Sequence, residues 1–440
     1  MGKAQFRRAS VLLSLTIGAA YAAPSLGQTA PIPHRDIAVN VDSGIVANHG
    51  AVPGVVFSTI IESRRASWLR LRFAEVTLAG APATGDGSYL RITSLLDGGQ
   101  QPLNAEHVGH WNNTSAYFNG DAVLLELVAY PGTGGNRVRL TEMWAGDPTA
   151  GFTDTICGPT DDRQLSTDPR TARLMPIGCT AWLINDGAHC FLTAGHCISA
   201  STTNAVVQFN VPLSNANGST VNPPPQHQYP AHQPSIRSIG SGGVGNDAAY
   251  FGANPNSVTQ LTAYQAQGAA FTIANAPAPT PGQQIRITGY GTVSSPVSPT
   301  WSQVQKTHVG PYAGLNGNNV RYTTDTTGGN SGSPVIDETT GNAIGIHTHG
   351  GCTSAAGTFN NGTAIQHPGL QNFLANPLGV CIPPVCYADC NGSGNLTVAD
   401  FGCFQGRYVL GNMYADCDAG GSLTVADFGC FQGKYVVGCP

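Results

Sequence analysis

A glycine-rich stretch around one serine places the tightest constraint on how this chain can fold. Residues 327–334 read Thr-Gly-Gly-Asn-Ser-Gly-Ser-Pro and are followed by the apolar pair Val335-Ile336. Glycines on both sides of Ser331 let the backbone turn sharply and bring its N–H groups close to a bound molecule. The amides of Gly329 and Ser331 could then donate hydrogen bonds to a developing oxyanion. We therefore predict a nucleophile at Ser331 and an oxyanion hole formed by Gly329 and Ser331.

A serine is a weak nucleophile, so this interpretation requires a base and a group that orients the base. Upstream, residues 193–197 read Thr-Ala-Gly-His-Cys and supply His196. Between the two motifs, Asp247 stands at the head of the apolar run 247–251. The sequence thus predicts a catalytic set of His196, Asp247 and Ser331, in that order along the chain.

These motifs, in this order, resemble those of the chymotrypsin-like serine peptidases, and more closely their bacterial glutamyl and lysyl endopeptidase branches. The resemblance covers roughly Cys157 to Leu378. It implies a chymotrypsin-like double six-stranded β-barrel over residues 152–380. It also implies hydrolysis of protein or peptide substrates through an acyl-enzyme on Ser331, with no cofactor needed for catalysis.

The composition agrees with a mainly β protein. Among 440 residues there are 56 glycines and 30 prolines, which favours many turns and short strands over long helices. The formal net charge is −5, so the chain lacks the basic footprint of a nucleic-acid-binding protein. We expect no nucleic-acid partner.

The N-terminus has the pattern of a secretory signal peptide, predicted at residues 1–22. Basic residues precede an apolar run from Val11 to Ala20, and Ala20-Tyr21-Ala22 forms an A-x-A cleavage site. No later segment is apolar enough to span a membrane. Twelve cysteines, an even number, fit a disulfide framework in an exported protein. We expect a secreted, extracellular protein.

Residues 23–40 are rich in Ala, Pro and Gln and are predicted to be a linker. The next stretch, 41–148, contains short strand patterns separated by turns and predicts a β-sandwich; the candidate strands are Trp68–Phe73, Tyr89–Ile92, Ala122–Leu127 and Asn136–Leu140. It is similar to the propeptide-like sandwich that precedes lysyl-endopeptidase-like peptidases. If the sandwich is removed, cleavage is expected near Ala145 to Ile156.

The same resemblance implies the disulfides Cys179–Cys197 and Cys157–Cys352, which leaves Cys190 and Cys381 as a further pair. In digestive relatives a new N-terminus pairs with an aspartate just before the serine. Asn330 occupies that position here, which argues against that activation mechanism.

The stretch 343–352 predicts one wall of the substrate pocket. It is an apolar strand that ends in polar residues and glycines and can pair with an extended peptide. By the resemblance, His347 and Thr326 fall where glutamyl endopeptidases bind a substrate carboxylate, which favours Glu or Asp at P1, the residue before the cleaved bond. Asp325 falls where trypsin-like members bind Lys or Arg, so a basic preference stays open. His347 could also be a packed strand histidine.

After a proline pair, residues 385–440 contain two copies of one pattern at a 27-residue period, opening at Tyr387 and Tyr414. Oxygen-bearing side chains recur at the spacing of a calcium-binding loop. The predicted ligands are Asp389, Asn391, Ser393, Asn395, Thr397 and Asp400 in the first copy, and Asp416, Asp418, Ser422, Thr424 and Asp427 in the second. Glycine stands at position 5 of the second loop, so we expect the weaker site there.

This repeat resembles the duplicated calcium-loop and helix units of dockerin domains, with short helices expected at Phe401–Tyr408 and Phe428–Tyr435. The resemblance implies structural Ca²⁺ and a cohesin-like docking partner on a scaffold or cell surface. A disulfide-stapled repeat without calcium is the alternative. For the whole chain, the alternative to a peptidase is a non-catalytic surface-binding protein that keeps the fold and docks through the repeat.

Overall fold

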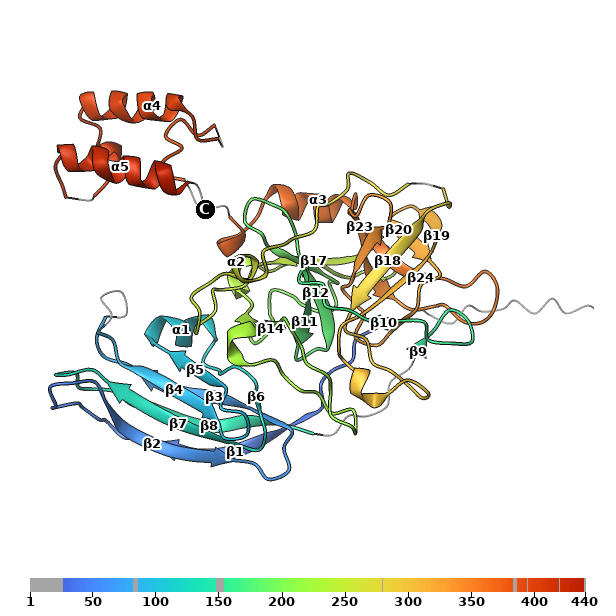
Figure 1. Ribbon diagram of the computed structural model, residues 1–440, viewed down its shortest axis with the longest axis horizontal. Helices are drawn as coiled ribbons and strands as arrows, with labels where there is room; N and C mark the ends of the chain where they lie inside the picture. The colour runs from blue at the N-terminus through green and yellow to red at the C-terminus, as the bar shows by residue number, and fades with distance from the viewer. Residues whose placement is uncertain are drawn as a thin grey trace, which may run out of the picture.

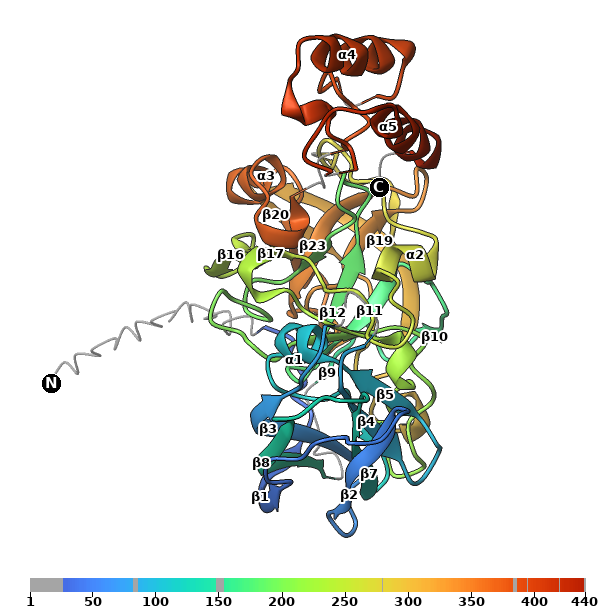
Figure 2. The ribbon, with the colours of Figure 1, turned by 90° about the vertical axis from the view of Figure 1, so that its left-hand side faces the viewer.

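The protein, described here by a computed structural model, consists of two β-rich units followed by a pair of helices (Figure 1). The described residues are 27–81, 86–147, 154–278, 280–382, 386–393, 395–418 and 420–438. The predicted signal peptide and residues 148–153 of the expected cleavage stretch lie outside them. Figure 2 shows the units following one another along the molecule, with the sandwich at one end and α4 and α5 at the other.

The N-terminal unit is a β-sandwich of two four-stranded antiparallel sheets. The first sheet has the order β1 (His34–Asp42), β8 (Arg137–Gly146), β3 (Trp68–Thr77) and β6 (Phe118–Asn119). The second has the order β2 (Gly54–Glu62), β7 (Ala122–Ala129), β4 (Tyr89–Ser94) and β5 (Gln100–Leu103), followed by the short helix α1 (Ala105–His110). All four candidate strands of the sequence lie in these sheets.

Strand β1 corrects the expected boundary of the sandwich. It begins at His34, within the stretch predicted to be a linker, and pairs with β8 from His34–Gly146 to Asp42–Arg139. Ile37, Val39 and Val41 alternate with exposed residues and are only half-buried, because β1 lies at the edge of its sheet. The alternation of Ile37, Val39 and Val41 was the local signal for this strand, and the linker prediction from the Ala, Pro and Gln content overlooked it.

The first half of β3 is more deeply buried than its alternation of apolar and basic residues indicates. Arg70 is 1% exposed and donates hydrogen bonds to Tyr117 Oη, Thr114 Oγ1 and the carbonyl oxygens of Ser115 and Asn204. Burial lowers the pKa of this guanidinium. Since Asn204 belongs to the next unit, Arg70 links the sandwich to the first barrel.

The second unit contains a half-barrel, called the first barrel below, and a closed second barrel. The first barrel is an open seven-stranded sheet with the order β15 (Gln228–Pro230), β14 (Val206–Gln208), β11 (Thr171–Met175), β12 (Cys179–Leu183), β13 (Phe191–Thr193), β17 (Asp247–Phe251) and β16 (Arg237–Ser241). Strands β11 to β14 and β17 are buried along their whole length.

The second barrel has the order β10 (Gln164–Leu165), β19 (Lys306–Asn316), β18 (Gln284–Gly289), β22 (Pro334–Asp337), β23 (Ala343–His349), β24 (Asn360–Ala364) and β20 (Asn319–Tyr322). Pairing of β19 with β20 closes six of these strands into a barrel. A two-stranded ladder, β9 (Asp154–Thr155) with β21 (Thr326–Thr327), lies beside it. The fold is the mainly β, chymotrypsin-like double barrel that the sequence predicts.

The remaining helices are short. They are α2 (Ala263–Gln267), α3 (Pro368–Ala375), α4 (Val398–Val409) and α5 (Val425–Val437), with 3-10 turns at Pro225–His227, Gln233–Ser235, Pro299–Trp301, Gly379–Cys381 and Met413–Ala415. No helix within the described ranges is long and apolar enough to cross a membrane.

Disulfides join Cys157 to Cys352, Cys179 to Cys197, Cys190 to Cys381, Cys390 to Cys403 and Cys417 to Cys430.

In the C-terminal repeat, each helix begins at a threonine cap and is longer than the sequence indicated. The hydroxyls of Thr397 and Thr424 accept from backbone N–H groups two residues on, and a capping aspartate three residues on completes each cap. The helices pack through aromatic rings, with Phe404 and Phe431 stacked at 4.2 Å between ring centroids. The two halves of the repeat thus form one small core.

The sandwich and the first barrel share a buried interface. Met175 and Val206 of the barrel pack into the sandwich core. The Gln228 side chain reaches from β15 to the backbone of Tyr117. Gln228 Oε1 accepts from Tyr117 N at 2.9 Å, and Gln228 Nε2 donates to the Tyr117 carbonyl oxygen at 2.8 Å. The sandwich is therefore packed against the peptidase-like unit rather than loosely tethered to it. Ala145, at one end of the expected cleavage stretch, is a fully buried residue of β8.

We predict that Gln228→Ala destabilises the protein by several kcal/mol, measured by chemical or thermal unfolding. The change leaves the buried N–H and carbonyl of Tyr117 without partners, and each such loss costs about 1–3 kcal/mol. The same change at the exposed Gln100 should cost less than about 0.5 kcal/mol. Equal effects of the two changes would mean that Gln228 does not tie the units together.

Candidate active site

The loop that carries Ser331 depends on two glycines with positive φ. Gly329 has φ +102° and Gly332 has φ +91°, values that residues with side chains rarely adopt. A Cβ at Gly332 would collide with the Thr180 carbonyl oxygen, and one at Gly329 with the Tyr290 carbonyl oxygen. The loop between β21 and β22 can therefore pack against Thr180 of the first barrel and Tyr290 of the second only with glycine at these positions.

The amides of this loop converge on one carbonyl oxygen. Gly329 N and Ser331 N lie 2.6 Å and 3.3 Å from the carbonyl oxygen of Gln28, to which both donate. Gln28 belongs to the segment just before the sandwich and is 5% exposed. The predicted oxyanion-hole donors therefore point to a common acceptor, as an oxyanion hole requires.

His196 and Asp247 are in direct contact. His196 follows β13 and Asp247 begins the adjacent strand β17, so the ladder brings them together. Asp247 Oδ2 lies 2.5 Å from His196 Nδ1, and Asp247 Oδ1 accepts from the His196 backbone N–H at 2.9 Å. The carboxylate is fully buried. This arrangement fixes Nδ1 as the protonated nitrogen and leaves Nε2 to act as a base.

The hydroxyl of Ser331 points away from that base. Its Oγ donates to the Thr348 carbonyl at 3.0 Å and accepts from Gln28 N at 2.8 Å. His196 Nε2 is buried and has no hydrogen-bond partner among the described residues. Rotation of the serine side chain is needed to join Ser331 to His196.

A buried arginine supports the loop from behind. Arg163 Nη1 donates to Thr327 Oγ1 at 2.7 Å and to Asn330 Oδ1 at 3.2 Å, and Asp161 pairs with the same guanidinium at 2.6 Å. Asn330 Oδ1 also accepts from Thr327 N at 3.0 Å. Asn330 stands where digestive peptidases carry an aspartate, and its side-chain amide is held by hydrogen bonds within the loop.

At the predicted substrate pocket, His347 is fully buried and its side chain meets that of Gln28. Its Nε2 is in hydrogen-bond contact with Gln28 Oε1, and its Nδ1 lies 2.6 Å from Tyr322 Oη. Burial, with smaller effects of His349 and His196, lowers the pKa of His347 to about 3. A neutral imidazole with Tyr322 donating to Nδ1 carries its proton on Nε2, facing the pocket.

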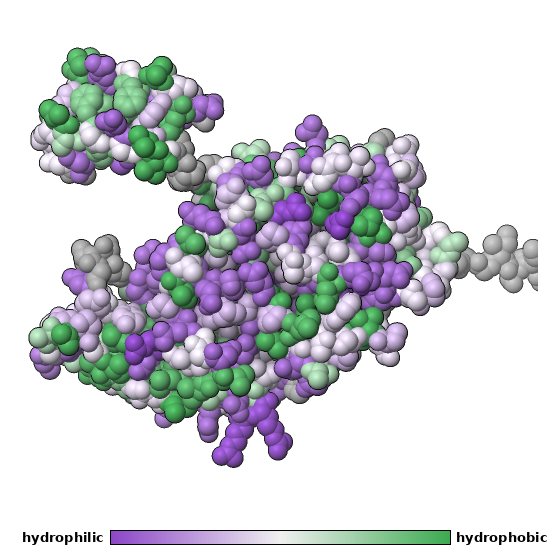
Figure 3. All heavy atoms as spheres, in the orientation of Figure 1, coloured by the Kyte–Doolittle hydropathy of each residue, from purple (hydrophilic) through white to green (hydrophobic). Residues whose placement is uncertain are grey.

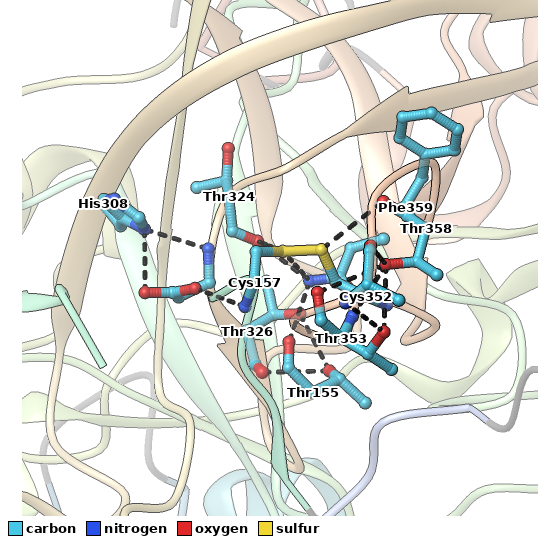
Figure 4. Close-up of a disulfide and its surroundings, with 12 residues drawn as sticks. Thr155, Cys157, His308, Thr324, Thr326, Cys352, Thr353, Thr358 and Phe359 are labelled. Carbon is cyan, nitrogen blue, oxygen red and sulfur yellow. Dashed lines mark hydrogen bonds and ion pairs between the residues drawn. A yellow bond between two sulfur atoms is a disulfide. The ribbon is translucent and has the colours of Figure 1, made fainter. Parts of the chain in front are cut away.

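Thr155 completes the pocket and was not identified from the sequence. Its Oγ1 contacts Gln28 Nε2 and donates to the Thr326 carbonyl at 3.0 Å (Figure 4). The hydroxyl of the predicted pocket residue Thr326 lies 3.5 Å from Thr155 Oγ1. Thr155 lies two residues before Cys157, and the disulfide to Cys352 brings it close to the strand of His347. That pairing was the signal that could have located it.

Asp325 lies behind the pocket with both carboxylate oxygens engaged. Oδ1 accepts from Cys157 N at 2.7 Å and Oδ2 from Asp162 N at 2.9 Å, while His308 Nδ1 lies 3.4 Å from Oδ2 (Figure 4). Burial raises the pKa of this carboxyl, and the two backbone N–H groups oppose the rise. The structure gives Asp325 a role in holding the segment from Cys157 to Asp162.

The acidic residues of the C-terminal repeat gather at the two loops. Carboxylate oxygens of Asp416, Asp418 and Asp427 lie within 4.8 Å of one another. In the first copy, Asp400 accepts from Asn391 N at 3.3 Å, as Asp427 does from Asp418 N. The backbone N–H of Thr397 lowers the pKa of Asp400, and that of Thr424 lowers the pKa of Asp427. Ionised oxygen ligands at this spacing fit Ca²⁺.

Comparison with known proteins supports the peptidase interpretation for the middle of the chain. The family of the trypsin-like peptidase domain matches residues 179–346, which include His196, Asp247 and Ser331. No curated protein matches the chain.

Among solved structures, a Glu endopeptidase in complex with MPD is similar at 23% identity and a TM-score of 0.38, over 50% of this chain and 98% of that one. A thermostable serine protease, AL20, from an extremophilic microorganism is 18% identical at a TM-score of 0.34, over 47% of this chain and 94% of that one. Neuropsin, a serine protease expressed in mouse brain, gives the same identity, TM-score and coverage.

We predict that His347→Gln flattens the pH dependence of stability between about pH 6.5 and pH 3. An unfolded histidine titrates near pH 6.5, whereas folded His347 stays neutral down to about pH 3. The stability it contributes is therefore complete above pH 6.5 and is lost as the pH falls. Removing it should reduce the slope of the free energy of unfolding by up to about 1.4 kcal/mol per pH unit.

The matched change His49→Gln, at an exposed histidine, should leave this slope as in the wild type. The account of His347 fails if both variants keep the wild-type slope in urea unfolding at a series of pH values.

Proposed function

We propose that this protein is a secreted serine endopeptidase that uses Ser331, His196 and Asp247. The observation that carries the proposal is the convergence of Gly329 N and Ser331 N on one peptide carbonyl beside Ser331 Oγ. Two amides aimed at a carbonyl next to a hydroxyl and an aspartate-held imidazole are the parts that acyl transfer needs. The bonded cysteine pairs fit an oxidising, extracellular location.

In this proposal, Ser331 Oγ attacks the substrate carbonyl and gives its proton to His196 Nε2. Asp247 holds the imidazole tautomer and stabilises the imidazolium that forms. The Gly329 and Ser331 amides stabilise the oxyanion, and loss of one such donor typically costs about 10²–10³ in rate. His196 then protonates the leaving amine, and water repeats the attack on the acyl-enzyme.

The pocket favours Glu or Asp at P1. His347 Nε2–H and the Thr155 hydroxyl are the polar groups that meet the end of the Gln28 side chain, and glutamate has the same shape. A bound carboxylate would raise the pKa of His347 and strengthen its hydrogen bond. Asp325 has its oxygens occupied by backbone N–H groups, which argues against a pocket for Lys or Arg.

Digestion of a denatured protein mixture, followed by sequencing of the new termini, should place most cuts after Glu or Asp. His347→Ala should lower kcat/KM for Glu substrates by roughly 10- to 100-fold, because a hydrogen bond to a charged group contributes about 1.5–3 kcal/mol. The exposed His49→Ala is the control. Cuts mainly after Lys or Arg would exclude the acidic pocket, and no cuts by wild-type protein would favour the non-catalytic binding protein.

For the C-terminal repeat, we propose two structural Ca²⁺ sites and docking to a cohesin-like partner. Exposed apolar side chains at equivalent positions of the two copies support a docking surface: Val398 and Val425 are 86% and 82% exposed, and Val409 and Val436 are 76% and 78% exposed. Figure 3 shows apolar atoms on this part of the molecular surface. Exposed apolar groups of this kind mark interaction sites.

Calorimetric titration should show two bound Ca²⁺ ions per chain. Asp400→Ala should remove the tighter site and Asp427→Ala the weaker one, because each variant loses the ligand at position 12 of its loop. Asp121→Ala, at an exposed aspartate of the sandwich, should keep both sites. If the wild-type protein binds no Ca²⁺ at millimolar concentration, the calcium sites are excluded and the repeat is held together by its disulfides alone.

A further inference from the structure

The segment between residues 27 and 32 crosses the candidate active site in the manner of a bound substrate. On one side of Ser331, Gln28 N donates to the Thr348 carbonyl at 3.3 Å, and Gly27 forms an antiparallel bridge with His349. Backbone pairing with the end of β23 is how an extended peptide adds to an exposed strand. The chain thus presents its own residues along the strand that forms the pocket wall.

The Gln28 side chain and carbonyl take the positions of a P1 residue. The side chain reaches His347 Nε2 and Thr155 Oγ1, and the carbonyl oxygen accepts from Gly329 N and Ser331 N. Ser331 Oγ lies 2.8 Å from Gln28 N. One residue therefore fills the pocket and the oxyanion hole together, which places the Gln28–Thr29 peptide bond at the nucleophile.

The residues after that bond are held on the opposite side of the cleft. Ala30 N donates to the Gly178 carbonyl at 2.9 Å and Ile32 N to the Pro176 carbonyl at 3.0 Å. Gln303 Nε2 donates to the Ala30 carbonyl at 3.0 Å. A Cβ at Gly178, which has φ +63°, would collide with that same carbonyl oxygen. The loop after β11 therefore accommodates the segment only because it carries glycine.

The sandwich anchors the segment from its far end. Ile32 is 3% exposed and belongs to the sandwich core, and β1 begins two residues later. Because the sandwich packs on the first barrel through Gln228 and Arg70, it fixes where residues 29–32 lie. The threading of the cleft thus follows from the packing of the two units.

We propose that the Gln28–Thr29 bond is a processing site that the protein cleaves with its own active site. The proposal rests on the proposed serine endopeptidase function and adds the first substrate of that site. While Gln28 fills the pocket, no other P1 residue can enter. Cleavage releases the residues up to Gln28 and opens the pocket, whereas the sandwich, which begins after Thr29, stays in the mature chain.

The step begins when Ser331 Oγ turns from the Thr348 carbonyl to His196 Nε2. Oγ bonds to the Gln28 carbonyl carbon, and its proton passes to His196. The Gln28–Thr29 C–N bond then breaks as His196 delivers that proton to Thr29 N. One water molecule hydrolyses the ester, gives one proton through His196 back to Ser331 Oγ, and leaves a carboxyl group at Gln28 and a free amine at Thr29.

The test compares the N-termini of purified full-length proteins by intact mass and terminal sequencing. The wild type should begin at Thr29. Ser331→Ala should keep the Gln28–Thr29 bond, and Gln28→Lys should keep it too, because the pocket offers His347 and Thr155 but no free carboxylate. Gln28→Glu should be processed like the wild type. Gln100→Lys, the same charge change at an exposed sandwich residue, should also begin at Thr29.

One further measurement separates this proposal from the function on which it rests. Each protein is assayed with a fluorogenic Glu substrate whose small leaving group needs only the pocket side of the cleft. A wild type that hydrolyses this substrate with the Gln28–Thr29 bond intact would overturn the processing site and leave the endopeptidase. A wild type that neither hydrolyses it nor processes itself would overturn both.

Processing by the chain's own active site also predicts resistance in trans. Active enzyme added to Ser331→Ala protein should leave its Gln28–Thr29 bond intact, because Gln28 is 5% exposed and bound in its own cleft. Cleavage of that bond in trans, or a Thr29 terminus on Ser331→Ala as purified, would show that another molecule performs the cut.

Discussion

The arrangement of the candidate site depends on the hydrogen bonds of the buried Asp247 carboxylate. A buried charge is costly unless it is paired and hydrogen-bonded. Asp247 meets that requirement with the backbone N–H and Nδ1 of His196, both from the first barrel. Its own backbone N–H and carbonyl bond to Thr363 Oγ1 of the second barrel at 3.0 Å and 2.7 Å. One residue therefore fixes the imidazole and joins the two barrels at the cleft.

The serine loop reaches its shape by a different means from the one known in digestive relatives. Arg163, neutralised by Asp161, holds Thr327 and Asn330, and the amides of Gly329 and Ser331 already share an acceptor. In the proposed mechanism, these two amides already converge without a new N-terminus inserted beside the serine. What blocks the pocket is instead the Gln28 side chain, which the sandwich positions. Maturation in this account removes an occupant rather than reshaping a loop.

Most of the features that could be predicted from the sequence were predicted from short local motifs. The double barrel, the contact between His196 and Asp247, and four strands of the sandwich follow from short patterns, whereas most of β1 was taken for part of a linker. The role of Asp325 could not be read from its offset to Ser331, because it depends on how Cys157 and Asp162 fold over it. Gln28 was hidden for the same reason: its contact with Ser331 spans 303 residues and leaves no local pattern.

The central claim is that Ser331 is an activated nucleophile, and covalent labelling tests it most directly. The processed protein would be treated with a fluorophosphonate and the modified residue located by peptide mass spectrometry. We expect one adduct, on Ser331, that is lost in His196→Ala because the hydroxyl then has no base. An unlabelled wild type, or equal labelling of wild type and His196→Ala, would contradict the account.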